Sequence, residues 1–281
     1  MKYIKYLVIA LAAVTMVACG DDEPKNNFTR DFTMIYPQFA STHKMISKIE
    51  QKFDNGDMIV ATANYDGDHL KSVNVVVNGR NDYTNEETIN FDYKNGAIIC
   101  DKSIQDVTYS FEINGHGAIT RLKNETTGRT AASLQYNNDN ELEIAQITTP
   151  STSDVTKVAW LNGNLMQWES TKITKKDSVV YEYGIGAPLN KGGIDVVGNE
   201  SFTFHKFVCA IMRNAGLFGA TSAYLPTVIK KGDDTQVDET TPAGSILLKR
   251  YDISYELDAD GYVKSYTTNE SPKYTVKYTY R

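Results

Sequence analysis

Alternation of hydrophobic and polar residues is the dominant pattern of the chain. In residues 88–93, 107–113 and 274–280 every second residue is aromatic or aliphatic, and the residues between them are mostly polar. A period of two cannot form one stripe along a helix, so these segments are predicted to be β-strands with one buried face. The 18 tyrosines agree with this prediction, because aromatic rings are favoured on pleated surfaces.

Tight turns separate the alternating segments. Asn-Gly and Asp-Gly pairs tolerate the positive φ of type I′ turns, and between alternating runs they are a strong signal of a hairpin. Seven such pairs occur: Asn55-Gly56, Asp66-Gly67, Asn78-Gly79, Asn95-Gly96, Asn114-Gly115, Asn162-Gly163 and Asp260-Gly261. We therefore predict an all-β fold, an antiparallel meander that forms a curled sheet or a barrel.

An aromatic residue also recurs about once per hairpin. The six residues are Tyr65, Tyr93, Phe111, Tyr136, Trp160 and Tyr183, which are separated by 28, 18, 25, 24 and 23 residues. This loose repeat resembles the tyrosine-rich YD-type β repeats. The resemblance implies a strand-turn-strand unit.

The pattern is interrupted after residue 183. Residues 184–198 are rich in glycine and predict a loop. Apolar residues then recur at helical spacing, with Lys206, Arg213 and Asn214 on the other side, which predicts one amphipathic helix near 200–215 that packs on the sheet. Gly216 is suited to the left-handed position that ends a helix.

Two further features complete the predicted domain. Asn199 or Ser201 is a suitable N-cap for the helix. A polar loop is predicted over residues 230–244 before strands resume. Residues 28–281 are therefore predicted to form a single antiparallel β domain with a helix and loop insertion at 184–244.

The N-terminus carries the features of an exported protein. Two lysines precede residues 6–17, an uncharged and mostly apolar run of 12 residues. This run is shorter than the ~20 residues of a membrane-spanning helix and is typical of a signal peptide. Met16-Val17-Ala18-Cys19 resembles the lipobox of bacterial lipoproteins, in which the cysteine is acylated. The alternative is an ordinary signal peptide with an incidental cysteine.

The lipobox defines the predicted organisation of the N-terminal region. Residues 1–18 are predicted to be a lipoprotein signal peptide, and residues 19–27 an acidic tether that follows the lipidated Cys19. Two or three acyl chains would hold the protein stably on a membrane. The predicted location is the outer membrane, with the lipid-anchored protein exposed at the cell surface.

Composition excludes one class of partner. The net charge of −6 and the pI of about 5.3 argue against nucleic acid, because such binding depends on lysine and arginine contacts to phosphates. Beyond Cys19 the chain has two cysteines, Cys100 and Cys209, both in apolar surroundings. Two buried thiols are the preferred interpretation, and a disulfide between them is the alternative.

A resemblance to a known family rests on several of these features together. They are the lipobox cysteine with its acidic tail, the Asn-Gly hairpins, Gly216-Leu217-Phe218-Gly219, and Tyr224-Leu225-Pro226. The chain resembles a family of Bacteroidetes surface lipoproteins that share a domain of unknown function with a porin-like fold. The resemblance implies a barrel-like sheet and supplies no catalytic residues. Because several strands are too short or too mixed for a lipid-facing band, we expect the barrel wall to face water.

No catalytic, cofactor or metal site is predicted. The four histidines, at positions 43, 69, 116 and 205, lack the spacing of a helical zinc site. Asp258-Ala259-Asp260-Gly261 is similar to part of a calcium loop, but Thr267 stands where a bidentate glutamate belongs, which favours a β-turn. Nothing suggests a hydrolase nucleophile, so we predict that the protein is not an enzyme.

Trp160 and Trp168 are the candidate ligand-binding residues, because indole rings can stack on sugars. If Asn162-Gly163 is a two-residue turn, Trp160 pairs with Leu165, and the two tryptophans are predicted to face opposite sides of the sheet. A three-residue loop would put them on the same side. The leading functional hypothesis is a non-catalytic module that binds a glycan, peptide or small amphiphile. The alternative is a structural or accessory envelope lipoprotein that binds other proteins.

Overall fold

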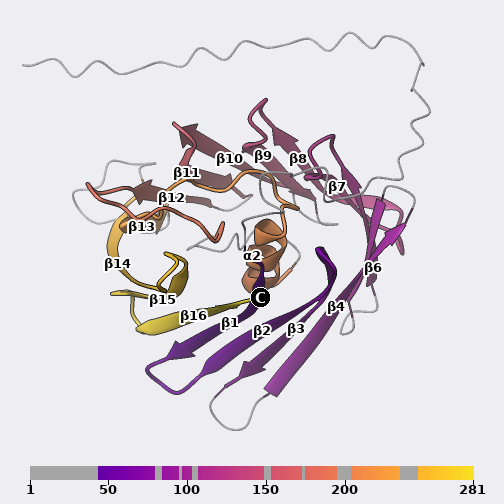
Figure 1. Ribbon diagram of the computed structural model, residues 1–281. Helices are drawn as coiled ribbons and strands as arrows, with labels where there is room; N and C mark the ends of the chain where they lie inside the picture. Colours follow the sequence, from indigo (N-terminus) through magenta and orange to yellow (C-terminus); the bar gives the residue numbers. More distant parts are fainter. Residues whose placement is uncertain are drawn as a thin grey trace, which may run out of the picture.

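Sixteen antiparallel strands form a closed barrel (Figure 1). The computed structural model describes residues 44–79, 84–94, 97–102, 107–148, 153–172, 175–194, 204–234 and 246–281. Each strand pairs with its neighbours in sequence, and β1 pairs with β16 to close the ring. The strands are β1 (Ile46–Phe53), β2 (Met58–Asp66), β3 (His69–Asn78), β4 (Thr84–Lys94), β5 (Ala97–Lys102), β6 (Val107–Ile113), β7 (Ile119–Asn124), β8 (Arg129–Tyr136), β9 (Leu142–Thr148), β10 (Ser153–Leu161), β11 (Asn164–Thr171), β12 (Lys176–Glu182), β13 (Val228–Asp233), β14 (Lys249–Leu257), β15 (Val263–Thr268) and β16 (Tyr274–Tyr280). The predicted antiparallel meander is confirmed.

The alternation along each strand separates an apolar interior from a polar outer wall. On β16 the inward Val276 and Tyr278 are buried, whereas the outward Lys277 and Thr279 are exposed. Charged residues occupy outward positions on many strands, among them Lys48, Glu50, Glu86, Asp92, Lys157, Glu169, Arg250, Glu256 and Lys264. A lysine or arginine on the lipid face of a membrane barrel costs about 2–4 kcal/mol at the midplane. The outer wall is therefore polar, in agreement with the expectation of a wall that faces water, which stays a prediction.

The helix lies inside the ring of strands. Helix α2 (Lys206–Asn214) packs against β1, β2 and β3, and it appears within the barrel in Figure 1. Every residue from Phe207 to Asn214 is buried, including Arg213 and Asn214. The predicted helix that packs on the sheet is confirmed, and its enclosure by the barrel also buries Arg213 and Asn214 of its polar side. In the described residues, no helix has the length and apolarity needed to cross a membrane.

The ends of α2 differ in part from prediction. His205 is the N-cap, and its Nδ1 accepts a hydrogen bond from the backbone N–H of Phe207 at 3.2 Å. The predicted caps, Asn199 and Ser201, lie outside the described residues. At the other end Gly216 adopts the expected left-handed conformation, with φ of 81°. The helix boundary near Gly216 is confirmed.

The insertion is shorter than predicted. It joins β12 to β13 and ends before Val228, so part of the predicted loop at 230–244 is a strand. Lys231 and Asp233 point inward on β13, opposite Val179 and Asp177 of β12. These charged inward residues made the strand resemble a loop in the sequence.

The barrel has two distinct ends. At the insert end lie the β12–β13 insertion and the turns at 67–68, 114–118, 137–141, 162–163 and 258–262. At the far end lie the turns at 54–57, 125–128 and 269–273. A 16-stranded barrel is too wide for its own wall side chains to fill, as the aqueous channels of 16-stranded porins show. The insertion fills the lumen at its own end.

Aromatic side chains tie neighbouring strands together at the insert end. The hydroxyl of Tyr65 donates to the carbonyl oxygen of Ile46 at 2.8 Å, which connects the end of β2 to the start of β1. Equivalent bonds run from Tyr136 to Ile119, Trp160 to Leu142, Tyr183 to Leu165 and Tyr280 to Val263, at 2.7–3.0 Å. The aromatic repeat in the sequence is therefore a repeat of these bonds. Phe111 does not belong to the series, because its side chain has no donor, and Ile113 rather than an aromatic residue ends β6.

Candidate functional site

Inward side chains are fully buried in the insert half of the barrel, whereas along part of the wall they are only half-buried towards the far end. Inward residues of the insert half are at most 2% exposed: Ile46, Leu70, Ile98, Ile119 and Leu142. Inward residues nearer the far end are only half-buried: Phe53, Ile59, Val77, Val107 and Tyr274. The register directs these side chains into the barrel, so we infer a recess along this sector of the inner wall. The inward far-end residues Ile147, Ser170 and Thr268 are buried.

A polar and aromatic group lines one sector of this recess. We call Phe53, Lys231, Tyr251, Glu270 and Tyr274 the far-end cluster. Phe53 and Tyr274 are paired in register on β1 and β16, and their ring centroids lie 5.8 Å apart at a tilt of 58°. Both rings are half-buried. The pair offers apolar ring surface at the far end of the lumen.

An ion pair adjoins the two rings. Nζ of Lys231 donates to both carboxylate oxygens of Glu270, at 3.0 and 2.7 Å, and the hydroxyl of Tyr274 donates to Oε2 of Glu270 at 3.2 Å. The two charged side chains retain 29% and 25% of their exposure. Lys231 also lies 5.4 Å from the ring centre of Tyr251, whose pKa is raised by burial and by Glu270. The arrangement provides an accessible carboxylate and ammonium beside aromatic rings.

A buried amide lies deeper on the same wall. Gln51 is two residues from Phe53 on the inward face of β1, and it pairs with Val276. Its side chain is 1% exposed, and its Oε1 has no hydrogen-bond partner among the described residues. A buried polar atom without a partner costs about 1–3 kcal/mol. A bound water or a polar ligand group would relieve that cost.

The two tryptophans both face the interior. Trp160 pairs with Leu165 as expected, but a bulge between Ala159 and Trp160 leaves Met166 outside the regular pairing, and Val158 pairs with Trp168. The prediction that the tryptophans face opposite sides is therefore wrong, because the bulge shifts the alternation by one residue. Trp168 is buried, with the guanidinium of Arg213 5.9 Å from its ring centre. Ligand contact by Trp160 and Trp168 stays a prediction.

The remaining candidate residues show no reactive arrangement in the described part of the chain. Cys100 and Cys209 are buried and form no disulfide, as the preferred interpretation predicted. Burial, with a contribution from Lys206, lowers the pKa of His205 to about 4. No group of three or more potential metal ligands occurs among the described residues. Cys19, the predicted lipidation site, lies outside them.

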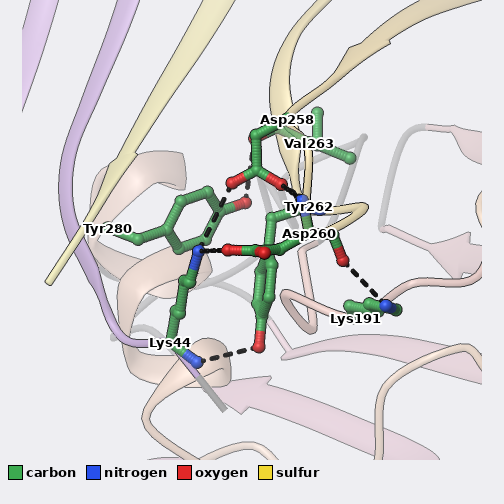
Figure 2. Close-up of polar contacts among 7 residues, drawn as sticks. All are labelled: Lys44, Lys191, Asp258, Asp260, Tyr262, Val263 and Tyr280. Atoms are coloured by element: carbon green, nitrogen blue, oxygen red, sulfur yellow. Dashed lines mark hydrogen bonds and ion pairs between the residues drawn. The ribbon is translucent and has the colours of Figure 1, made fainter. Parts of the chain in front are cut away.

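The predicted β-turn at 258–261 is confirmed. Oδ1 of Asp258 accepts hydrogen bonds from the backbone N–H groups of Asp260 and Tyr262, both at 2.9 Å, which hold its pKa below the usual range. Lys44 lies 2.6 Å from Oδ2 of Asp260 and 3.5 Å from Oδ2 of Asp258 (Figure 2). Lys191 donates to the carbonyl oxygen of Asp260 at 2.7 Å. The carboxylates of Asp258 and Asp260 therefore form ion pairs with Lys44, and Asp258 also stabilises the turn through its backbone hydrogen bonds.

Comparison with solved structures agrees with the barrel. The chain is similar to a porin-like protein from Bacteroides uniformis, with a TM-score of 0.63 and 17% sequence identity. The similarity covers 84% of this chain and 98% of the other. The two chains share a porin-like fold. Neither the models of known protein families nor the curated proteins include a significant match to this chain.

The far-end cluster was not visible in the sequence. Lys231 and Glu270 are 39 positions apart, and Lys231 falls in a segment that was predicted to be a loop. The strand that contains Tyr274 was predicted from its alternation. The pairing of Tyr274 with Phe53 was not, because it requires β16, the last strand, to pair with β1, the first. The only available signal was that Phe53 and Tyr274 are aromatic residues that each lie beside a turn, one in the first hairpin of the barrel and one in the last.

Proposed function

We propose that the protein is a non-catalytic binding module that takes a small sugar-containing ligand into the far half of its lumen. The observation that carries this proposal is an accessible ion pair, Lys231–Glu270, beside inward and half-buried aromatic rings. Barrel mouths are common ligand sites, with mostly apolar walls and a few convergent polar groups.

The chemistry of the far-end cluster favours sugars over purely apolar ligands. The rings of Phe53, Tyr251 and Tyr274 offer surfaces for the C–H face of a sugar ring. The Glu270 carboxylate accepts hydrogen bonds from hydroxyl groups, and the Lys231 ammonium donates to them. An alkyl chain would leave this ion pair desolvated and without new partners, at a cost in affinity.

We further propose that the module acts at the cell envelope, held by acyl groups on Cys19. The lipobox-like sequence at 16–19 and the acidic residues after it support this location. The polar outer wall supports attachment by an anchor rather than by insertion of the barrel. The similarity to a porin-like protein from Bacteroides uniformis is compatible with an envelope protein.

A ligand panel tests the binding proposal. Neutral oligosaccharides, octyl glucoside, short peptides and fatty acids would each be titrated into the full chain, with intrinsic fluorescence and thermal unfolding as readouts. We expect saturable binding by the oligosaccharides or by the glucoside head group. Binding by fatty acids alone would contradict the choice of ligand class. No binding by any member of the panel would contradict the proposed function.

A further inference from the structure

An apolar patch protrudes from the insert end of the barrel. Within the described part of the chain, the exposed large hydrophobic side chains are Leu161, Ile185, Leu189, Tyr224 and Leu257. All five belong to the insert end, on hairpin termini or on the insertion. Ile185 is fully exposed, and Leu161, Leu189 and Tyr224 are 59%, 53% and 42% exposed. The water-facing wall and the far end expose no comparable side chain among the described residues.

Hydrogen bonds show that most of these side chains come from adjoining segments. The backbone N–H of Ala223 donates to the carbonyl oxygen of Gly163, two residues beyond Leu161, at 2.9 Å. The next residue, Tyr224, forms an isolated antiparallel bridge with Leu189. Ile185 lies in the turn that precedes Leu189. We call Leu161, Ile185, Leu189 and Tyr224 the insert-end patch.

The chain enters the barrel at this same end. Lys44, the first described residue, is held at the insert end by Asp258 and Asp260 of the β14–β15 turn, and its backbone N–H donates to the hydroxyl of Tyr262 (Figure 2). Residues 20–43 separate the predicted lipid anchor, Cys19, from Lys44, a length of 24 residues. Fully extended they would reach ~80 Å, which allows the insert end to lie directly on the membrane. An anchor joined at this end therefore permits the patch to reach lipid without turning the barrel over.

We propose that the insert-end patch rests on the lipid surface to which Cys19 is anchored, with the far end directed away from it. The inference depends on the anchor in the proposed function but not on the ligand. Exposed apolar groups of this kind mark interaction sites. Tyrosine is enriched at membrane–water interfaces, where its ring contacts lipid and its hydroxyl stays hydrated. The aliphatic side chains beside it would enter the boundary between head groups and acyl chains.

This orientation explains the different surfaces of the two ends. The protein would contact the membrane through the filled end, where no ligand can enter. The open end, with Phe53 and Glu270, would face the surrounding solution. A glycan outside the cell could then reach the lumen without crossing the plane of the membrane.

Depth-dependent quenching tests the inference on the full lipidated chain. Ala223→Cys places a thiol within the patch, and Thr126→Cys places one at a far-end turn; both native residues are exposed. Each variant is labelled with an environment-sensitive fluorophore and reconstituted into phosphatidylethanolamine–phosphatidylglycerol vesicles that contain spin-labelled lipid. Cys100 and Cys209 are buried, so labelling selects the introduced thiol. Mass spectrometry first confirms acylation of Cys19, which separates failure of the anchor from failure of the patch.

We expect blue-shifted and quenched emission at position 223 and neither effect at position 126. The additional changes Ile185→Ser and Leu189→Ser should largely remove quenching at 223 while acylation is retained. Val60→Ser with Val76→Ser, an outward pair on neighbouring strands, is the matched control and should leave quenching unchanged. Equal quenching at both positions, or quenching at 126 alone, would overturn the proposal. Cross-linking between two copies through position 223, without quenching, would also overturn it and assign the patch to self-association.

Discussion

The hydroxyl of Tyr280 lies 3.0 Å from the carbonyl oxygen of Val263 and donates a hydrogen bond to it. The bond joins the last residue of β16 to the first residue of β15. Burial raises the pKa of Tyr280 well above its ordinary value, so the hydroxyl remains a donor at any physiological pH. Because other strand pairs have the same contact, the rim of the insert end is held by side chains as well as by the backbone ladder.

Removing one of these hydroxyl groups tests their contribution to stability. Tyr136→Phe keeps the ring but loses the 2.9 Å bond to the carbonyl oxygen of Ile119. We expect the free energy of unfolding to fall by about 0.5–1.5 kcal/mol, the usual net value of such a bond. Urea unfolding followed by circular dichroism measures the change. Tyr224→Phe, at an exposed position, is the control, and an equal loss in both variants would refute the role of the bond.

Gly219 illustrates a position where a side chain cannot fit. Its φ is +75°, and an added Cβ would lie 2.4 Å from the carbonyl oxygen of Asn140 and 2.7 Å from the ring of Tyr136. Gly219→Ala is expected to destabilise the fold by about 1–2 kcal/mol for the left-handed backbone and by ~1–3 kcal/mol more for the clash. Gly128→Ala is the control, since Gly128 has φ of +69° but open space around it. Similar unfolding midpoints for the two variants would contradict the packing described here.

His205 makes stability depend on pH. The folded chain binds the proton near pH 4 and the unfolded chain near pH 6.5, so the unfolded state holds more protons between these values. Stability is therefore expected to decrease as the pH falls from 6.5 towards 4, by up to about 3 kcal/mol. His205→Ser replaces the Nδ1 acceptor of the N-cap with a hydroxyl oxygen that does not titrate, and it should flatten the profile in this window. Unfolding free energies measured at several pH values test this, and an unchanged slope in the variant would assign the dependence to other groups.

The far-end cluster can be tested separately from the fold. Glu270→Gln should weaken binding of an oligosaccharide by about tenfold or more, which corresponds to ~1.4 kcal/mol, because the carboxylate is lost. It should change stability by less than about 1 kcal/mol, because the Lys231–Glu270 pair is partly exposed. Glu256→Gln removes an ion pair with Lys264 on the outer wall and serves as the control. Isothermal titration should show weaker binding in the first variant and unchanged affinity in the second.

The strands and their buried faces could be predicted because alternation is local. Residues 274–280 show the pattern clearly, and the structure buries Val276 and Tyr278 as expected. β13 was missed because two charged residues, Lys231 and Asp233, occupy its inward positions, which removes the apolar face that a strand normally shows. Local patterns therefore identify strands with an apolar inner face more readily than strands whose inner face carries charges.

Three features depended on contacts between distant residues. Closure of the barrel requires β1 to meet β16, which pairs Phe53 with Tyr274 across nearly the whole domain. The bulge beside Trp160 places Trp168 on the inner face of the sheet instead of the outer face, and no feature of the sequence indicated the bulge. The burial of Arg213 follows from enclosure of α2, whereas the sequence of the helix alone is that of a surface helix. Each of these outcomes is set by tertiary structure.

Binding inside the far half of the lumen is tested most directly by two adjacent valines on β3. Val77 points into the lumen and Val76 points outward, and both are half-buried. Titration of the tightest-binding member of the ligand panel into Val77→Trp and Val76→Trp compares the two sides of the wall with the same substitution. We predict that Val77→Trp weakens binding by about tenfold or more, since the indole occupies the recess, and that Val76→Trp leaves affinity unchanged. Equal affinities in both variants and the unaltered protein would contradict a lumenal site.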